Sequence, residues 1–457
     1  MNTVKKSYIE TFGCQMNERD SEIMGQMLCN ADYSPTEDIH QADVIVINTC
    51  SIREKAEQKV YSLLGRLKKL KQKKPDLIIS VAGCVAQQEG ERLQARMPLV
   101  DIVLGPQQIY CLPELVSRAA QKGKPLMAVD LSPSFEIPRY IPPSPAISRQ
   151  KDDRIASTLY FKKFVTIMQG CNNFCTYCVV PYTRGRETSR KPDDILAEIE
   201  ALAEQGVKEI TLLGQNVNSY GKYPADSRNY KSFPELLRKV AALENIKRIR
   251  FTTSHPKDLS PELVACFADV AKLCPHFHLP VQSGSNPVLK RMNRGYTVEE
   301  YLAKVDTLRQ VKPDIALTTD IIVGFPGETD KDFQATMDLL ETVRYHGAFS
   351  FKYSDRPQAK AVAFDNKVAE EVKSERLSCL QQKQNEISLQ KNRGYEGSIQ
   401  HIMLEGQSKN GDGQWSGRTM SNIIVNFEGP AALSAGQEVQ VRITEGLLHS
   451  LRGVLSL

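Results

Sequence analysis

The chain has 457 residues, of which 41% are hydrophobic and 25% are charged, and its formal net charge is +5. This length is too great for one ordinary hydrophobic core, so we expect two to four domains. The apolar runs are of strand length, and no apolar stretch follows the basic start, so the sequence predicts neither a membrane span nor a secretory signal. We therefore expect a cytoplasmic protein. The mildly positive charge suits a nucleic-acid partner and an ordinary enzyme equally.

Eleven cysteines stand in the chain. In a reducing compartment they are poor candidates for disulfides, and an odd number supports that interpretation. We therefore consider them as metal ligands.

Residues 1–122 predict a doubly wound, parallel sheet. Short apolar, β-branched runs are each followed by a segment with helical patterning, and such alternation is typical of parallel α/β folds. The predicted strands are Ser7 to Phe12, Val44 to Asn48, Leu77 to Ala82 and Asp101 to Leu104.

A cysteine follows each of the first three predicted strands, namely Cys14, Cys50 and Cys84. Ligands of open α/β sheets bind outside the carboxyl ends of the strands, so these cysteines should converge on one edge. We interpret them as three ligands of an iron–sulfur cluster. The alternative is that each is a small, buried packing residue.

Prolines dominate residues 123–157, which we interpret as a linker without regular helix or central strand. From 158 to 391 the alternation returns with six strand–helix units, which indicates a partial (βα)6 barrel. Its predicted strands are Phe164 to Met168, Glu209 to Leu213, Arg248 to Thr253, His276 to Val281, Ile315 to Val323 and Ala348 to Tyr353.

The first strand of this barrel leads into a loop with Cys171, Cys175 and Cys178 in a Cys-x3-Cys-x2-Cys spacing. A structural zinc ion asks for a fourth protein ligand, and the loop offers no further Cys or His. Three cysteines can instead hold a cubane iron–sulfur cluster with one iron left open for chemistry. Arg184, which follows the loop, could bind a carboxylate or a phosphate, or simply close the loop.

Residues 392–457 change period to short alternating strands broken by glycines, the pattern of a small β-barrel of the OB class. Its composition is not basic, so RNA binding would depend on particular side chains. We take Arg418, Thr419 and Asn422 as candidates, with Trp415 or Phe427 available to stack a base. A purely structural barrel is the alternative.

These motifs together resemble the radical S-adenosylmethionine (SAM) methylthiotransferases over the whole chain. The similarity rests on TFGCQMN, NTCSIREKA and GCVAQ in the first domain, on GCNNFCTYCVVPYTRGRE in the second, and on a tail similar to the TRAM domain. It implies two [4Fe-4S] clusters, with SAM on the open iron of the Cys171, Cys175 and Cys178 cluster. It also implies SAM contacts at the ends of the barrel strands, for which the candidates are Gln215, Asn216, Ser254, Gln282, Ser283, Asp320 and Gly324.

Within the family, ETFGCQMNERDSE and the cysteine loop resemble most the enzymes that act on isopentenylated adenosine at position 37 of tRNA, next to the anticodon. The resemblance implies that one cluster cleaves SAM to a radical that removes hydrogen from C2, while the cluster on Cys14, Cys50 and Cys84 supplies sulfur. It further implies an electron donor such as a flavodoxin or ferredoxin and a donor of sulfur. We also expect a monomer.

Three alternatives stay open. Sister methylthiotransferases modify an aspartate of a ribosomal protein or threonylcarbamoylated adenosine in tRNA. The third alternative is an iron–sulfur RNA-binding regulator without turnover, against which the polar ends of the barrel strands argue.

Overall fold

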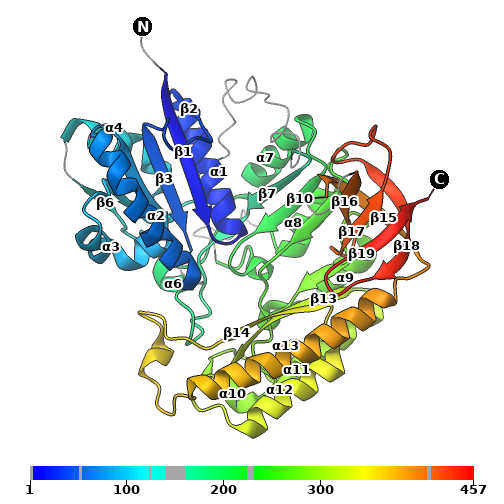
Figure 1. Ribbon diagram of the computed structural model, residues 1–457. Helices are drawn as coiled ribbons and strands as arrows, with labels where there is room; N and C mark the ends of the chain where they lie inside the picture. Colours follow the sequence, from blue (N-terminus) through cyan, green and yellow to red (C-terminus); the bar gives the residue numbers. More distant parts are fainter. Residues whose placement is uncertain are drawn as a thin grey trace. The chain divides into compact units, whose positions relative to one another are not determined.

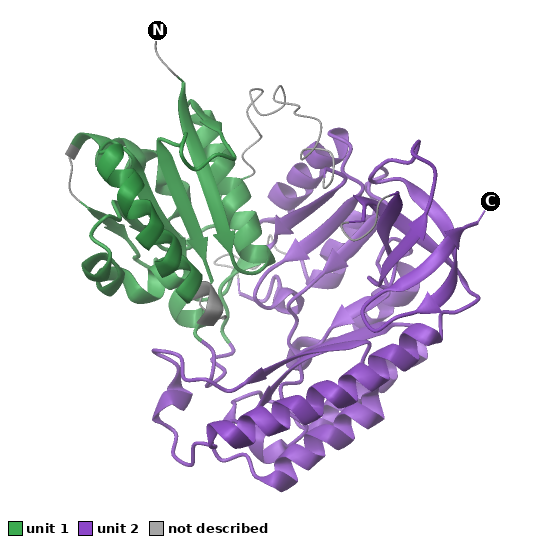
Figure 2. Ribbon diagram, viewed as in Figure 1, with its two compact units in different colours: residues 1–152, 168–172, 179–190 green, residues 153–167, 173–178, 191–457 purple. Residues whose placement is uncertain are grey.

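The computed structural model describes residues 4–50, 54–122, 125–139, 160–223, 231–408 and 413–456, without the side chains of 54–57 and 122. The chain divides into two compact units (Figure 2). The first unit comprises residues 1–152, 168–172 and 179–190, and the second comprises 153–167, 173–178 and 191–457. The chain therefore passes between the units several times around the loop that carries Cys171, Cys175 and Cys178, hereafter the cysteine loop.

A six-stranded, fully parallel sheet forms the centre of the first unit, in the order β2-β1-β3-β4-β5-β6 (Figure 1). The predicted doubly wound sheet is confirmed. Two short edge strands, β2 and β6, add to it, and β6 lies in the segment predicted as a linker. The strands are β1 (Lys5–Phe12), β2 (Tyr33–Pro35), β3 (Val44–Thr49), β4 (Ile78–Gly83), β5 (Ile102–Leu104) and β6 (Leu126–Ala128).

Helices cover both faces of this sheet because its central strands are apolar on both sides. Ile45 and Ile47 of β3 pack with helices α2 and α3, whereas Val44 and Val46 pack with α1 and α4. The helices are α1 (Gln15–Asn30), α2 (Glu54–Lys73), α3 (Cys84–Arg96) and α4 (Leu112–Lys122), and the 3-10 helix η1 (Ile109–Cys111) precedes α4. Each sheet face thus has its own hydrophobic core.

The cysteine-loop segments of the first unit add the pair β8 (Met168–Gln169) and β9 (Thr188–Ser189), together with the short helix α6 (Val180–Thr183). β8 and β9 pair antiparallel, which brings the two ends of the loop together.

Two three-stranded parallel sheets, β11-β10-β7 and β12-β13-β14, form the second unit's barrel. The bridge between Ile249 and Leu273 continues the parallel pairing beyond β11. Among the described strands, β14 pairs with β13 alone. The predicted partial (βα)6 barrel is confirmed. Its strands are β7 (Lys162–Thr166), β10 (Glu209–Leu213), β11 (Arg248–Phe251), β12 (His276–His278), β13 (Ala316–Val323) and β14 (Gly347–Lys352).

Helices follow the barrel strands in sequence, and most begin with a capping signal. Thr297 and Thr329 cap α11 and α12 through capping boxes, which satisfy the first free N–H groups of each helix. The α-helices are α7 (Pro192–Glu204), α8 (Phe233–Ala241), α9 (Pro261–Asp269), α10 (Asn286–Arg291), α11 (Val298–Val311), α12 (Asp330–Val343) and α13 (Glu370–Arg393). The 3-10 helices are η2 (Val217–Ser219), η4 (Pro256–Asp258) and η5 (Lys360–Ala363).

The tail closes into a five-stranded barrel, β15-β16-β17-β19-β18, as the alternating pattern predicts. Trp415 and Phe427 are 7% and 2% exposed in its core, and Trp415 Nε1 donates to Pro430 O at 3.2 Å. The expectation that these rings are available to stack a base is therefore wrong, because they hold the barrel together. The strands are β15 (Ile399–Gln407), β16 (Gln414–Thr419), β17 (Ile424–Glu428), β18 (Glu438–Gly446) and β19 (Leu451–Leu455).

Two buried arginines of β11 attach this small barrel to the rest of the second unit. Arg248 donates to the carbonyls of Arg418 (2.9 Å) and His401 (3.2 Å), and Arg250 donates to those of Thr419 and Met420 (2.9 Å each). The backbone carbonyls of β15, of β16 and of the turn after β16 therefore accept hydrogen bonds from β11, a strand of the (βα)6 barrel.

None of the described helices combines the length and apolar character that crossing a bilayer requires.

Candidate active site

Cys14, Cys50 and Cys84 follow three neighbouring strands, Cys14 two residues after β1 and the other two directly after β3 and β4. β1 pairs with β3 so that Phe12 faces Thr49, and Thr49 in turn faces Gly83 of β4. A hydrogen bond with Cys50 is the largest of the effects that lower the pKa of Cys14 to about 6, and the charge of Arg184 adds to it against the effect of burial. The structure thus brings these cysteines to one end of the sheet, and the lowered pKa of Cys14 favours the thiolate, the form that binds metals.

Two buried asparagines that sequence reasoning did not single out shape this strand end. Asn17 Nδ2 donates to Asn48 Oδ1 and to Thr49 O, both at 3.1 Å, and Asn48 Nδ2 donates to Asn17 O at 2.8 Å. Asn17 Oδ1 accepts from the Cys14 backbone N–H and thiol, both at 3.4 Å. Gly83 has φ +93°, and a Cβ there would lie 2.4 Å from Asn48 Oδ1, so no other residue fits.

Arg184 meets a carboxylate, which was one of the roles expected for it. Its Nη2 donates to Asp20 Oδ2 at 2.6 Å, and both side chains are almost fully buried. Burial alone would lower the pKa of Arg184, but the charges of Asp20, Cys84 and Cys14 raise it. A permanent positive charge therefore stands near Cys14 and Cys84, in the first unit.

Burial raises the pKa of Cys84, and the nearby positive charge of Arg184 opposes that shift. Among the described residues, no group of three or more His, Cys, Asp or Glu side chains is gathered around a point that could hold one metal ion. A cubane cluster binds its cysteines through different irons, so its ligands need not meet at one point. The donor set of three thiols, one of them acidic, fits such a cluster.

The second set of cysteines lies on the loop between β8 and β9. Cys171, in the first unit, donates its backbone N–H to Gly185 O at 3.2 Å. Gly170 has φ +81°, and a Cβ there would come within 2.0 Å of Arg186 O, so the loop requires glycine before its first cysteine.

Cys175 and Cys178, in the second unit, are joined by a turn in which Cys178 N–H donates to Cys175 O at 3.0 Å. Burial is the largest cause that raises the pKa of the Tyr177 hydroxyl, and the negative charges of the nearby Cys175 and Cys178 raise it further. Hydrogen bonds thus fix the backbone of the loop at its cysteines, which fits the iron–sulfur cluster inferred for these residues.

Several of the polar residues at the barrel strand ends are buried with unused hydrogen-bonding atoms. Asn216 Nδ2 donates to Asp258 Oδ2 at 2.7 Å, but Asn216 Oδ1, Ser254 Oγ and His255 Nε2 have no hydrogen-bond partner in the described part of the chain. Buried polar atoms normally have a partner, so a polar ligand is expected here. This observation fits SAM, whose ribose and methionine ends carry many polar groups.

Backbone strain gathers at the same ends. Thr253 after β11 and Gln282 beyond β12 have φ of +67° and +75°, in the left-handed region that a β-branched threonine rarely adopts. Such strain persists where the surroundings enforce it and is often part of a binding site. Gln215 lies beside Asn216 at the end of β10, half-buried.

The other predicted SAM contacts lie on or after β12 and β13. Asp320 lies within β13, not at its end as expected, whereas Gly324 directly follows that strand and Ser283 lies beyond β12. Ser283 is fully buried, and its Oγ accepts from Ser285 N–H at 3.2 Å. Asp320 faces His278, with 3.5 Å between Oδ1 and Nε2. Gly324 has φ +70° and donates its N–H to Glu328 Oε1 at 2.8 Å. Ser283 and Gly324 therefore have structural partners, whereas Asn216 and Ser254 retain unused atoms.

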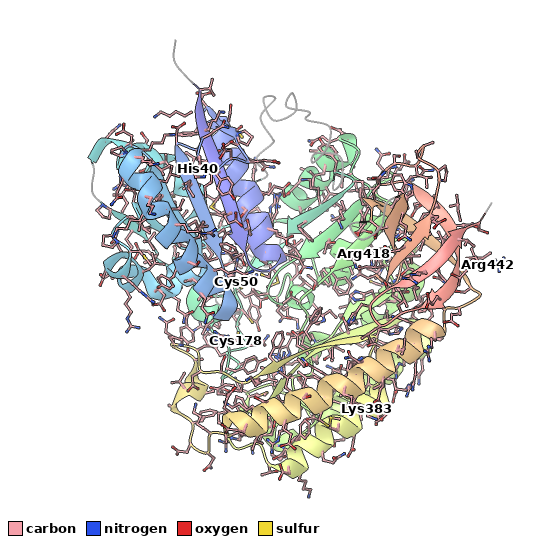
Figure 3. All side chains as sticks on the ribbon, viewed as in Figure 1. His40, Cys50, Cys178, Lys383, Arg418 and Arg442 are labelled. Atoms are coloured by element: carbon pink, nitrogen blue, oxygen red, sulfur yellow. The ribbon has the colours of Figure 1, made fainter. Side chains whose placement is uncertain are left out.

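The three candidate RNA contacts lie together at the end of β16. Arg418 Nε donates to Glu405 Oε1 at 3.1 Å, and Nη1 donates to Asn422 O at 3.2 Å. Thr419 is buried and its hydroxyl accepts from Ile423 N–H, while Asn422 has φ +68°. Figure 3 shows Arg418 on the small barrel, and its side chain is 31% exposed. Arg418 and Asn422 are both partly exposed, whereas Thr419 is buried, and RNA binding by this group stays a prediction.

Of the cysteines outside the two sets, Cys29, Cys266 and Cys274 are buried, whereas Cys111 and Cys379 are exposed.

Comparison with known proteins defines the class of this fold and site. The Radical SAM superfamily matches residues 165–340, the Uncharacterized protein family UPF0004 matches 6–105, and the TRAM domain matches 393–455. These matches give a radical SAM protein with one domain before its core and a TRAM domain after it.

Full-length relatives narrow the class. A tRNA-2-methylthio-N(6)-dimethylallyladenosine synthase of Desulfotalea psychrophila is 54% identical over 448 residues, 98% of each chain. The enzyme of the same name from Geotalea uraniireducens is 50% identical over 455 residues, 100% of each chain. The chain belongs to the family of tRNA-2-methylthio-N(6)-dimethylallyladenosine synthases.

Solved structures with the same fold are more distant. The radical SAM methyltransferase TsrM from Kitasatospora setae, with tryptophan and a SAM analogue bound, has a TM-score of 0.55 at 14% identity and covers 90% of this chain and 79% of its own. The cobalamin-dependent radical SAM enzyme OxsB, with aqua-cobalamin and SAM bound, has a TM-score of 0.52 at 14% identity, with 84% and 56% covered. At these identities the similarity concerns the fold alone.

Proposed function

We propose that this protein is a tRNA methylthiotransferase that replaces the C2 hydrogen of isopentenylated adenosine at position 37 with a methylthio group. The observation that carries the proposal is the 54% identity over 98% of the chain with a tRNA-2-methylthio-N(6)-dimethylallyladenosine synthase. The reaction breaks an unactivated C–H bond, which no acid or base of a protein can do, so cofactors must supply the chemistry.

Two [4Fe-4S] clusters and SAM complete the proposal. When bound, a cluster on Cys171, Cys175 and Cys178 supplies the electron that cleaves SAM to a radical, and a cluster on Cys14, Cys50 and Cys84 supplies the sulfur. The chain's own residues hold these groups. Asn17 and Asn48 fix the strand ends that carry the sulfur-supplying set.

Charge and polar groups prepare both sites. The buried guanidinium of Arg184 stabilises thiolates beside it in the first unit. In the second unit, Asn216 Oδ1, Ser254 Oγ and His255 Nε2 offer hydrogen bonds to SAM at the barrel strand ends. His255 Nδ1 accepts from Lys257 N–H at 3.2 Å, and burial lowers the pKa of the ring, so Nε2 carries the hydrogen and donates.

The proposed partners are a tRNA anticodon stem-loop, a low-potential electron donor such as a flavodoxin or ferredoxin, and a sulfur donor. The TRAM match at 393–455 supports an RNA partner. We propose a monomer that works in the cytoplasm.

The test is anaerobic reconstitution with iron and sulfide, followed by reaction with SAM and a strong reductant. Isopentenylated tRNA and a small-subunit ribosomal protein are offered separately, and mass spectrometry reports methylthio addition. Addition to the tRNA nucleoside alone is expected. Addition to the ribosomal protein instead would show that the substrate is the protein and not the tRNA. If the clusters form but SAM is not cleaved, the chain would be an RNA-binding regulator.

Single cysteine variants separate the two sites. Cys171→Ala is expected to abolish SAM cleavage, whereas Cys14→Ala should retain reductive cleavage and lose sulfur insertion. Cys29→Ala, a buried cysteine without a role in either set, is the matched control. Unimpaired methylthiolation by Cys171→Ala or Cys14→Ala would refute the assignment.

A further inference from the structure

A buried guanidinium lies against one cysteine of the loop in the second unit. Arg294 is 4% exposed, and its Nη1 donates to Cys175 Sγ at 3.3 Å and to Tyr177 Oη at 3.2 Å. Its Nε donates to Tyr296 Oη at 3.1 Å, and its Nη2 donates to Pro280 O at 2.8 Å. Every nitrogen of the guanidinium is therefore engaged, and one bond ends on sulfur.

The partners of Arg294 within the described chain include no carboxylate. Other buried arginines of this protein do have one, as Arg184 has Asp20 and Arg376 has Glu328. A buried cation without an anion is costly, so Arg294 needs a negative partner. The Cys175 sulfur is the only one of its four acceptors that becomes an anion on binding iron.

The backbone around Arg294 holds it in place independently of its own side chain. Thr176 N–H donates to Met292 O at 3.0 Å, and Thr176 Oγ1 donates to Arg291 O at 2.9 Å. Asn293 Nδ2 donates to the carbonyls of residues 173 and 174, both at 3.1 Å. The segment after α10 thus runs along the loop at residues 173–176. These bonds keep position 294 close enough for the arginine side chain to reach the Cys175 sulfur.

We propose that Arg294 is a positioning residue that holds the Cys175 sulfur of the radical SAM cluster and raises the reduction potential of that cluster. The inference rests on the proposed function, which places a cluster on Cys171, Cys175 and Cys178. Hydrogen bonds to cluster sulfurs and nearby positive charge both stabilise the added electron, which makes reduction easier. Without Arg294 the cluster is harder to reduce and holds Cys175 less firmly.

The experiment uses the full chain with Cys14, Cys50 and Cys84 replaced by alanine, so that only the loop cluster forms. After anaerobic reconstitution, iron per chain is counted and the midpoint potential is measured by a redox titration followed by electron paramagnetic resonance. Arg294→Gln and Arg294→Met are each expected to lower the equilibrium constant for reduction about tenfold, which is about 59 mV for one electron. Arg294→Lys, which keeps the charge, should recover part of that loss.

Arg291→Gln is the matched control. Arg291 lies three residues earlier, is exposed, and its guanidinium stands over the Phe364 ring at 5.6 Å. Its variant should keep the parent potential and iron content. A loss of iron in the glutamine and methionine variants that lysine restores would also support the proposal.

Parent potential and iron content in both Arg294→Gln and Arg294→Met would overturn the inference, as would losses that lysine does not restore. The outcome is separable from that of the proposed function. A potential shift in a protein that never modifies tRNA would refute the function and keep the role of Arg294. A parent that forms no cluster on its three intact cysteines would overturn both.

Discussion

Replacing Arg248 with methionine removes one of the two guanidinium groups that attach the C-terminal barrel to β11. Arg248 is 1% exposed and donates to two carbonyls of that barrel, Arg418 O at 2.9 Å and His401 O at 3.2 Å. Its Nε also donates to Glu438 Oε1 at 3.0 Å. Methionine keeps the apolar stem but leaves all three acceptors without this donor.

The magnitude follows from those acceptors. A buried carbonyl that loses its donor costs about 1–3 kcal/mol. Glu438 is 47% exposed and regains water, so its loss adds little. Because both carbonyls are only partly buried, we expect the barrel to lose about 2–4 kcal/mol of its free energy of unfolding. With a urea dependence of about 2 kcal/mol/M, in the middle of the usual range, the midpoint should fall by roughly 1–2 M.

Trp415 gives an assay specific to the barrel because it is the only tryptophan of the chain and lies in the barrel core. Its emission should shift to the red at lower urea in Arg248→Met than in the parent. Arg442→Met is the control: this exposed arginine of β18 (Figure 3) donates to Gly397 O at 3.3 Å, and its loss should change stability by less than about 0.5 kcal/mol. Equal midpoints for both variants and the parent would refute the reasoning.

Three further outcomes follow. A Cβ on Gly284 would lie 2.4 Å from a backbone oxygen of α12, so Gly284→Ala should lower the melting temperature by the equivalent of about 1–3 kcal/mol. A Cβ on Gly347 would have its nearest atom 3.8 Å away, so Gly347→Ala should leave the melting temperature unchanged. Equal melting temperatures for the two variants would contradict this. Burial lowers the pKa of His255, so below about pH 6.5 this histidine takes up a proton in the unfolded chain but not in the folded one. Its contribution should make the free energy of unfolding fall by about 1 kcal/mol per pH unit between pH 6 and 5. Urea titrations of His255→Gln over the same pH range should lack this contribution to the pH dependence. Asp20→Asn leaves Arg184 buried without a carboxylate and should cost the cluster-free protein about 3–5 kcal/mol in thermal unfolding, with an unchanged transition as the contrary result.

The sequence predicted the strands that carry the cysteines because they are long, apolar and β-branched, as in Val44–Thr49, where every residue is buried. The same pattern could not predict β2 or β6. These are three-residue edge strands with no fully buried residue, and pairing with a neighbour creates them. Edge strands of this length carry too little apolar patterning to be distinguished from a loop.

The convergence of Cys14, Cys50 and Cys84 followed from one rule about strand ends, but their surroundings did not. Asn17, Asp20 and Arg294 matter because of burial and because of partners far along the chain, and neither is visible in local sequence. Trp415 was misread for a related reason: alternation shows that a strand has two faces, but closure of the barrel decides which one is inside. Assignment of the cysteines as cluster ligands remains a prediction.

The ion pair between Asp20 and Arg184 joins residues 164 positions apart, both within the first unit. A ribosome that adds roughly 5–20 residues per second needs roughly 8–33 s to make the chain between them. Strands β1 to β6 can pair during that interval, yet Asp20 lacks its buried ion-pair partner, Arg184, until the cysteine loop has left the ribosome. The first unit therefore completes its core only when the loop that is to carry the radical SAM cluster has been synthesised, and a nascent chain cut short before it should retain an open, protease-sensitive strand end.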